Sequence, residues 1–215
     1  MLRRVFMLAG LAAPLGAAEI LDRIAVTIDN QVIAESDLIR DIRLSAFLNQ
    51  SQPDFSGRAK RATAERLVDR ALMRREIELS RYPLPGEKDA AAALENWRRE
   101  RFPDPAVYRQ ALAQAGIADS ALAAYMLEQL TALRFIDYRF RPTVQVGDAE
   151  IQQYYEKRFL PQWRPAGAAP APPLEQVAPK IEQILVEEKV DRMLEAWLKD
   201  ARSRARIVYR PAVFQ

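Results

Sequence analysis

The sequence contains neither cysteine nor histidine. Without cysteine, the chain can form no disulfide framework and can carry no lipid on a cysteine side chain. Without histidine, the common zinc sites are excluded, and so are the catalytic arrangements built on Ser, His and Asp or on Cys and His. We therefore expect no metal site, no cofactor and no catalytic residues.

Long apolar runs are also missing. The longest one, residues 5–15, follows Arg3 and Arg4 and precedes three small residues, Gly16, Ala17 and Ala18. It is well short of the roughly 20 residues that cross a bilayer as a helix, so we expect no stable membrane insertion. A basic start, an apolar run and small residues in this order are typical of a signal peptide. We predict that residues 1–18 are removed and that the mature protein is periplasmic or otherwise exported, by the general or the twin-arginine route.

A strong excess of positive charge is missing once this segment is set aside. Thirty of the 32 basic residues and all 29 acidic residues lie after residue 18, which leaves a net charge of +1. Arginines gather at Arg74 and Arg75 and again at residues 98–101, but acidic residues are interleaved with both groups. Such a mixture is typical of a solvated helix surface, and we expect no nucleic-acid partner.

Glycine is scarce, and every glycine after residue 18 falls between segments of helical periodicity. Ser36, Asp104, Asp119 and Asp148 are suitable capping residues, and Pro105 suits a first helical turn. Apolar residues spaced by three and four, as at Leu122, Met126, Leu130 and Leu133, favour helices. The predicted helices begin near Ser36, cover residues 58–81, 87–101, 105–112, 119–140 and 148–159, and end with one that starts between residues 174 and 179.

Alternating apolar residues at both ends of the mature chain predict strands. Ile24, Val26 and Ile28 are followed by Asp29 and Asn30, which suit a tight turn, so residues 24–33 read as a β-hairpin. A hairpin alone is marginally stable, and residues 207–209 form a strand with no neighbour in sequence to pair with. We therefore expect the last strand to join the hairpin. The predicted fold is mainly α, with residues 19–159 and 174–215 forming one helical domain.

Between these two parts lies a spacer, residues 160–173, that holds five of the chain's 14 prolines. Prolines make such a spacer semi-rigid.

Aromatic residues and one methionine form the candidate binding site. Tyrosine, tryptophan and methionine suit promiscuous contacts with apolar peptides. For any single one of them packing in the core is the more common role, and the group as a whole indicates binding better than its members do. The candidate peptide-binding residues are Trp97, Phe102, Tyr108, Tyr125, Met126, Tyr154 and Tyr155.

Five stretches of the chain, in order, resemble the SurA-like periplasmic chaperones, a family that includes the PpiD and PrsA foldases. They are RIAVTIDNQVIAESDLIRDI (23–42), LVDRALMRREIE (67–78), FPDPAVYRQALAQAGIADSALAAYM (102–126), VGDAEIQQYYEKRF (146–159) and residues 174–209. The resemblance implies a SurA N-terminal-like helical chaperone domain that binds unfolded or nascent envelope polypeptides.

Where such foldases carry a parvulin-type isomerase domain, this chain has only the spacer, which is far too short for a domain. Parvulin sites also characteristically contain histidine. We therefore expect no prolyl isomerase activity. Two alternatives stay open: the chain is an accessory subunit of a separate isomerase, or it is a scaffold subunit of an envelope complex, with a homodimer as one form.

Overall fold

The computed structural model describes residues 22–163 and 170–215, and the predicted signal peptide and residues 164–169 of the spacer lie outside them. The strands are β1 (Ile24–Ile28), β2 (Gln31–Ala34) and β3 (Ile207–Tyr209). The helices are α1 (Glu35–Leu48), α2 (Gly57–Leu79), α3 (Glu87–Arg101), α4 (Pro105–Ala115), α5 (Asp119–Arg139), α6 (Asp148–Tyr154), α7 (Leu160–Gln162) and α8 (Leu174–Arg204). The described chain is thus mainly helical with one small sheet, as predicted.

The three strands form an antiparallel sheet in the order β2-β1-β3. The predicted turn is present, and Asp29 adopts a left-handed backbone with φ of 49°. On the face of the sheet that meets α2, Val26 and Ile28 are buried against Val68 and Leu72. The prediction that the C-terminal strand returns to the N-terminal hairpin is confirmed.

Helix starts are predicted only in part. As expected, the Asp104 carboxylate caps α4, and Pro105 occupies its first turn. Three other predicted capping residues lie inside their helices, so these predictions are wrong: Ser36, Asp119 and Asp148. In α1 the helix begins one residue before Ser36, because the Asp37 carboxylate accepts a hydrogen bond from the Ala34 amide at 2.9 Å.

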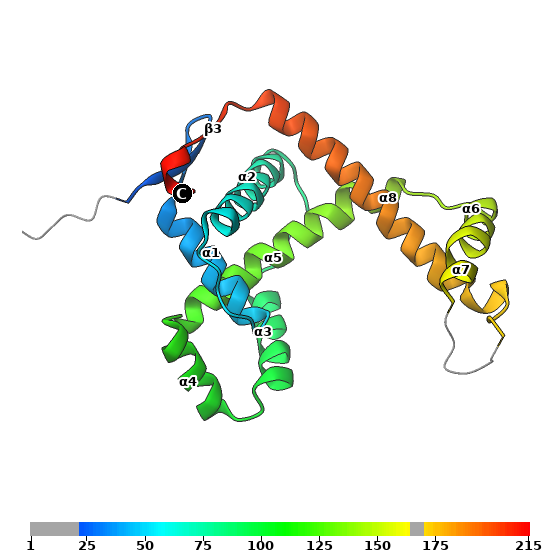
Figure 1. The fold of residues 1–215 in the computed structure, drawn as a ribbon, viewed down its shortest axis with the longest axis horizontal. Coiled ribbons are helices and arrows are strands. Elements are labelled where there is room, and N and C mark those ends of the chain that lie inside the picture. Colours follow the sequence, from blue (N-terminus) through cyan, green and yellow to red (C-terminus); the bar gives the residue numbers. More distant parts are fainter. Residues whose placement is uncertain (1–21, 164–169) are drawn as a thin grey trace, which may run out of the picture.

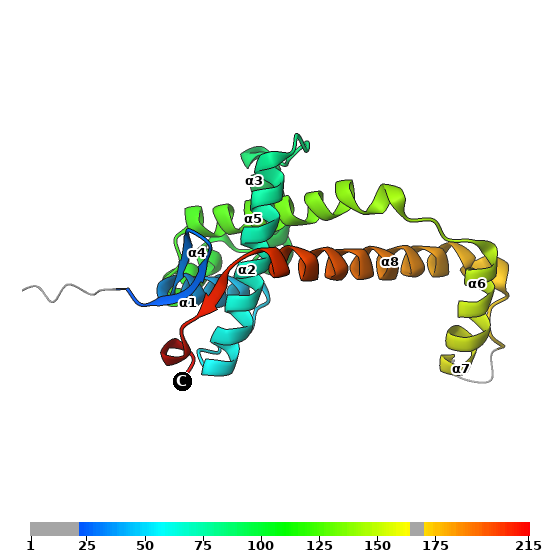
Figure 2. The ribbon, with the colours of Figure 1, turned by 90° about the horizontal axis from the view of Figure 1, so that it is seen from above.

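The molecule is elongated, with a main body at one end and a smaller lobe at the other (Figures 1 and 2). Helix α8 runs the length between them. Its C-terminal half packs on the body, where the ring of Trp197 lies 5.4 Å from that of Phe135. Its N-terminal half packs on α6, where Ile181 and Leu185 meet Ile151. Helix α8 thus contributes to the hydrophobic core of the main body and to that of the smaller lobe. Its packing on earlier helices is as predicted from the sequence.

The spacer is predicted to begin at residue 160, but in the structure the chain is still helical there. A π-helical turn, Tyr155–Phe159, follows α6, and the helix then continues through Leu160–Gln162 as α7. Pro161 has no amide hydrogen to donate within this continuous helix, and the helix ends one residue later at Gln162. On the far side, α8 begins at Leu174, within the predicted window. The hydroxyl of Tyr155 donates to the Pro172 carbonyl at 2.9 Å, which joins the two sides.

Candidate functional site

Five of the seven predicted binding residues lie together in one cluster of the main body. Tyr108 and Tyr125 are buried there, and the other three are half-buried around Phe47: Trp97, Phe102 and Met126. The rings of Phe47 and Phe102 stack at 5.9 Å, and Trp97 lies 5.6 Å from Phe102. This cluster is mainly the core that holds α3 and α4 against α1 and α5.

Burial and hydrogen bonding fix Tyr108 in that core. Its hydroxyl donates to Asp119 at 2.5 Å. Burial and this negatively charged acceptor raise the pKa of Tyr108. The bond links α4 to the first turn of α5, which explains why Asp119 does not cap its own helix.

The remaining two residues lie in the distal lobe. Tyr154 and Tyr155 are half-buried against Ile151 and the start of α8, in a separate core. The structure therefore does not bring the seven predicted residues into one groove. Helical spacing places residues on one face of a helix, but it does not tell whether that face meets solvent or another helix.

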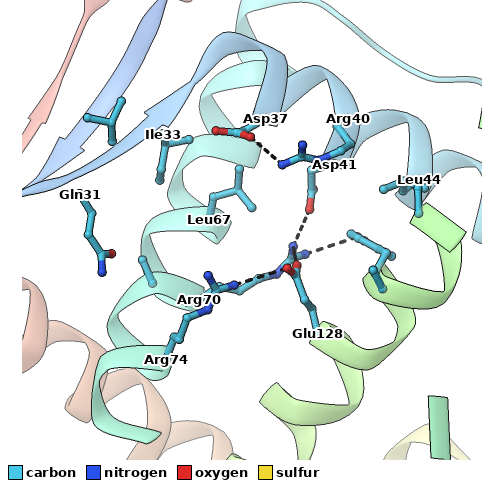
Figure 3. Close-up of a pocket in the computed structure, with 15 residues that line it drawn as sticks. Gln31, Ile33, Asp37, Arg40, Asp41, Leu44, Leu67, Arg70, Arg74 and Glu128 are labelled. Carbon is cyan, nitrogen blue, oxygen red and sulfur yellow. Dashed lines mark hydrogen bonds and ion pairs between the residues drawn. The ribbon is translucent and has the colours of Figure 1, made fainter. Parts of the chain in front are cut away.

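A pocket of about 440 Å³ opens instead between β2, α1, α2 and α5 (Figure 3). Its apolar lining comes from Val32, Ile33 and Leu44 on one side, and from Leu67, Ala71, Ala121 and Ala124 on α2 and α5. Among these residues Val32 is 54% exposed, so the apolar wall is partly in contact with solvent.

The centre of the pocket holds a buried ion pair. Asp41 of α1 is 3% exposed and accepts a hydrogen bond from Arg70 of α2 at 2.5 Å (Figure 3). A second arginine, Arg66, donates to the same carboxylate at 3.3 Å, and Arg70 also donates to the Tyr125 hydroxyl at 3.3 Å. Burial acts against the positive charge of Arg70, but Asp41 and Tyr125 outweigh it and raise its pKa.

More exposed charges line the rim. Arg40 pairs with Asp37 at 2.6 Å, and Arg74 pairs with Glu128 at 3.4 Å. The arginines are the more exposed partners: the side chains of Arg40 and Arg74 are 65% and 60% exposed, against 31% for Asp37 and 47% for Glu128. The rim therefore presents guanidinium groups to an incoming ligand.

A second pocket of about 330 Å³ adjoins the first and shares Arg70, Arg74 and Glu128 with it. The rest of its lining is mainly apolar and includes one further charged residue, Glu78. The other members are Met73, Ile77, Leu84, Leu127, Thr131 and Ala132. Leu84 is 44% exposed at its edge. The two pockets adjoin each other along α2 and α5, and we refer to the pair as the α2–α5 groove.

The residues at the centre of this groove are not among those predicted from the sequence. One signal was available, because Arg66, Arg70 and Arg74 follow one another at four-residue intervals and therefore share one face of α2. Asp41, the partner of Arg66 and Arg70, lies 25 and 29 residues away from them in sequence, and no pattern indicates that pairing.

Nothing in the described residues indicates a metal centre or a membrane span. In residues 22–163 and 170–215, no three His, Cys, Asp or Glu side chains are grouped so that they could hold a metal ion. Among the helices of the same ranges, none is both long and apolar enough to cross a membrane. In comparisons with known proteins, no family model matches the chain, and no curated protein matches it.

Proposed function

We propose that this chain is an exported SurA-like chaperone domain that binds unfolded or nascent envelope polypeptides in the α2–α5 groove, without catalysis. The observation that carries the proposal is the groove itself, in which two adjoining pockets combine apolar walls with a charged rim. Concave, mostly apolar sites with a few polar groups are where proteins bind ligands.

The chemistry of the groove suits segments of unfolded chains. Apolar side chains of a client lose contact with water against Val32, Leu67 and Leu84, while its backbone carbonyls accept hydrogen bonds from Arg40 and Arg74 on the rim. These donors recognise any backbone and no particular sequence. Binding is weak and unselective, because a mobile client loses chain entropy when it docks.

Suppression of aggregation tests this function. The mature protein is mixed with several unrelated unfolded proteins, and light scattering is followed with time. We expect suppression for most of them, reduced by Ala124→Trp, which fills the first pocket from an exposed position on its wall. The matched control is Ala92→Trp on α3, which is also an exposed helical position but lies outside both pockets, and it should behave like the wild type.

The two alternative functions give different results. A scaffold or an accessory subunit binds one partner tightly and leaves the aggregation of unrelated proteins unchanged. If no member of the panel is protected, the chaperone proposal is wrong. If protection is the same in the wild type and in Ala124→Trp, binding occurs somewhere other than the α2–α5 groove.

A further inference from the structure

Strand β2 is an outer strand of the sheet, and one of its residues directs its backbone away from β1. In an antiparallel pair, successive residues turn their N–H and C=O groups alternately toward one neighbour and the other. The Asp29 amide donates to Arg206 at 3.0 Å, and the Ala25 carbonyl accepts from Arg210 at 2.9 Å, so the residues that bond toward β3 are the odd-numbered ones of this stretch.

The same alternation fixes which residues face β2. Val26 and Ile28 turn their backbone groups toward β2, where they pair with Ile33 and Gln31. Val32, opposite Thr27, then turns its N–H and C=O outward, to the open side of the sheet. An outer strand with outward-facing groups is a template for one more strand.

This open side borders the first pocket. Gln31, Val32 and Ile33 all contribute to its lining, together with Arg40 and Arg74 on the facing helices (Figure 3). Because the two arginines are more exposed than their carboxylate partners, a strand lying beside Val32 meets the guanidinium groups of Arg40 and Arg74 before the carboxylates that they pair with.

We infer that the occupant of this site is an extended polypeptide segment with an acidic side chain, which pairs its backbone with Val32 as an added strand. Its carboxylate then approaches Arg74 or Arg40, and an apolar neighbour enters the pocket. Strand addition of this kind takes affinity from main-chain hydrogen bonds and selectivity from side-chain pockets. The inference rests on the proposed function and specifies the form of the client that binds.

Proline at position 32 tests the backbone pairing. Val32→Pro removes the outward N–H, and an outer strand tolerates proline where its amide faces solvent. The matched comparison is Val32→Ile, which keeps both the N–H and an apolar side chain at this position. The probe is a fluorescent nine-residue peptide of alternating valine and threonine with a central glutamate. We expect its Kd to be about three- to tenfold higher for Val32→Pro than for Val32→Ile, the usual effect of one lost hydrogen bond.

A second arm uses the wild-type protein only, so that it does not depend on the folding of a variant. We expect the probe to bind more weakly when alternate amides on one edge are N-methylated, and also when its central glutamate is replaced by glutamine. Equal binding of the N-methylated peptide overturns strand addition, and equal binding of the glutamine peptide overturns the preference for an acidic segment.

The proposed function and the inference of strand addition can be disproved separately. If the wild type binds neither these peptides nor any unfolded protein, the proposed function is wrong, and this inference fails with it. If unfolded proteins bind but N-methylation and Val32→Pro have no effect, only the inference is overturned.

Discussion

Neutralising Asp41 should destabilise the protein strongly, because this carboxylate is the buried partner of two arginines. The side chain of Asp41 is 3% exposed and that of Arg70 is 15% exposed. Asp41→Asn removes the buried countercharge of the Arg70 guanidinium and leaves it only the half-exposed Glu128 carboxylate, 3.9 Å away. Breaking a buried pair from one side typically costs about 3–5 kcal/mol, and we expect about 3 kcal/mol here because Arg66 is half-exposed and Asn keeps an acceptor.

Urea unfolding followed by circular dichroism measures this loss. For a chain of this length, about 3 kcal/mol also corresponds to a Tm lower by roughly 6–12 °C. The matched control is Asp200→Asn, which breaks the Arg204 pair between side chains that are 60% and 68% exposed. Pairs so exposed contribute little, and we expect a change within about 0.5 kcal/mol.

A double-mutant cycle separates the pair from its surroundings. Once Arg70→Met has removed the buried cation, Asp41→Asn should cost less than in the wild-type background, with a coupling of about 1–3 kcal/mol. Additive losses, or a loss for Asp41→Asn no larger than for Asp200→Asn, would refute the reasoning that the pair is buried and coupled.

Two further predictions concern the ends of the chain. Gly57→Ala places a Cβ only 1.9 Å from the backbone oxygen of Phe214, so the C-terminal segment must shift, and we expect a loss of about 1–3 kcal/mol in urea unfolding. We expect almost no loss for Gly86→Ala, where the nearest atom, a carboxylate oxygen of Asp89, is 3.9 Å from the added Cβ. Lys60 donates to Glu35 and, with Arg23, lowers its pKa. This stabilisation is present above the ordinary glutamate pKa of about 4.3 and is lost as the pH falls through the lowered value. The difference in unfolding free energy between pH 5 and pH 3 should therefore be smaller in Glu35→Gln, and an unchanged difference would contradict it.

Local signals in the sequence predict much of the fold. The turn at Asp29 and Asn30, the start of α4 at Asp104 and Pro105, and the C-terminal strand are found where expected. The turn and the helix start depend on neighbouring residues only. The strand prediction depends on the fact that a hairpin is marginally stable until a third strand joins it.

Features that depend on distant residues are predicted less well. Leu133 belongs to the expected apolar stripe of α5 but is 58% exposed, because the helices that pack on α5 cover the face of Tyr125 and Phe135 instead. The pairing of Asp41 with Arg70 likewise joins residues 29 positions apart. Periodicity identifies a face of a helix, whereas tertiary packing decides what that face meets.

Photo-cross-linking tests most directly whether clients occupy the α2–α5 groove. A benzoylphenylalanine is placed at position 124, on the wall of the first pocket, or at position 92, on α3 outside both pockets. Each protein is irradiated with a fluorescent unfolded protein, and the cross-linked band is measured. We predict strong cross-linking from position 124 and little from position 92. Equal yields from the two positions, or a higher yield from position 92, would contradict the account.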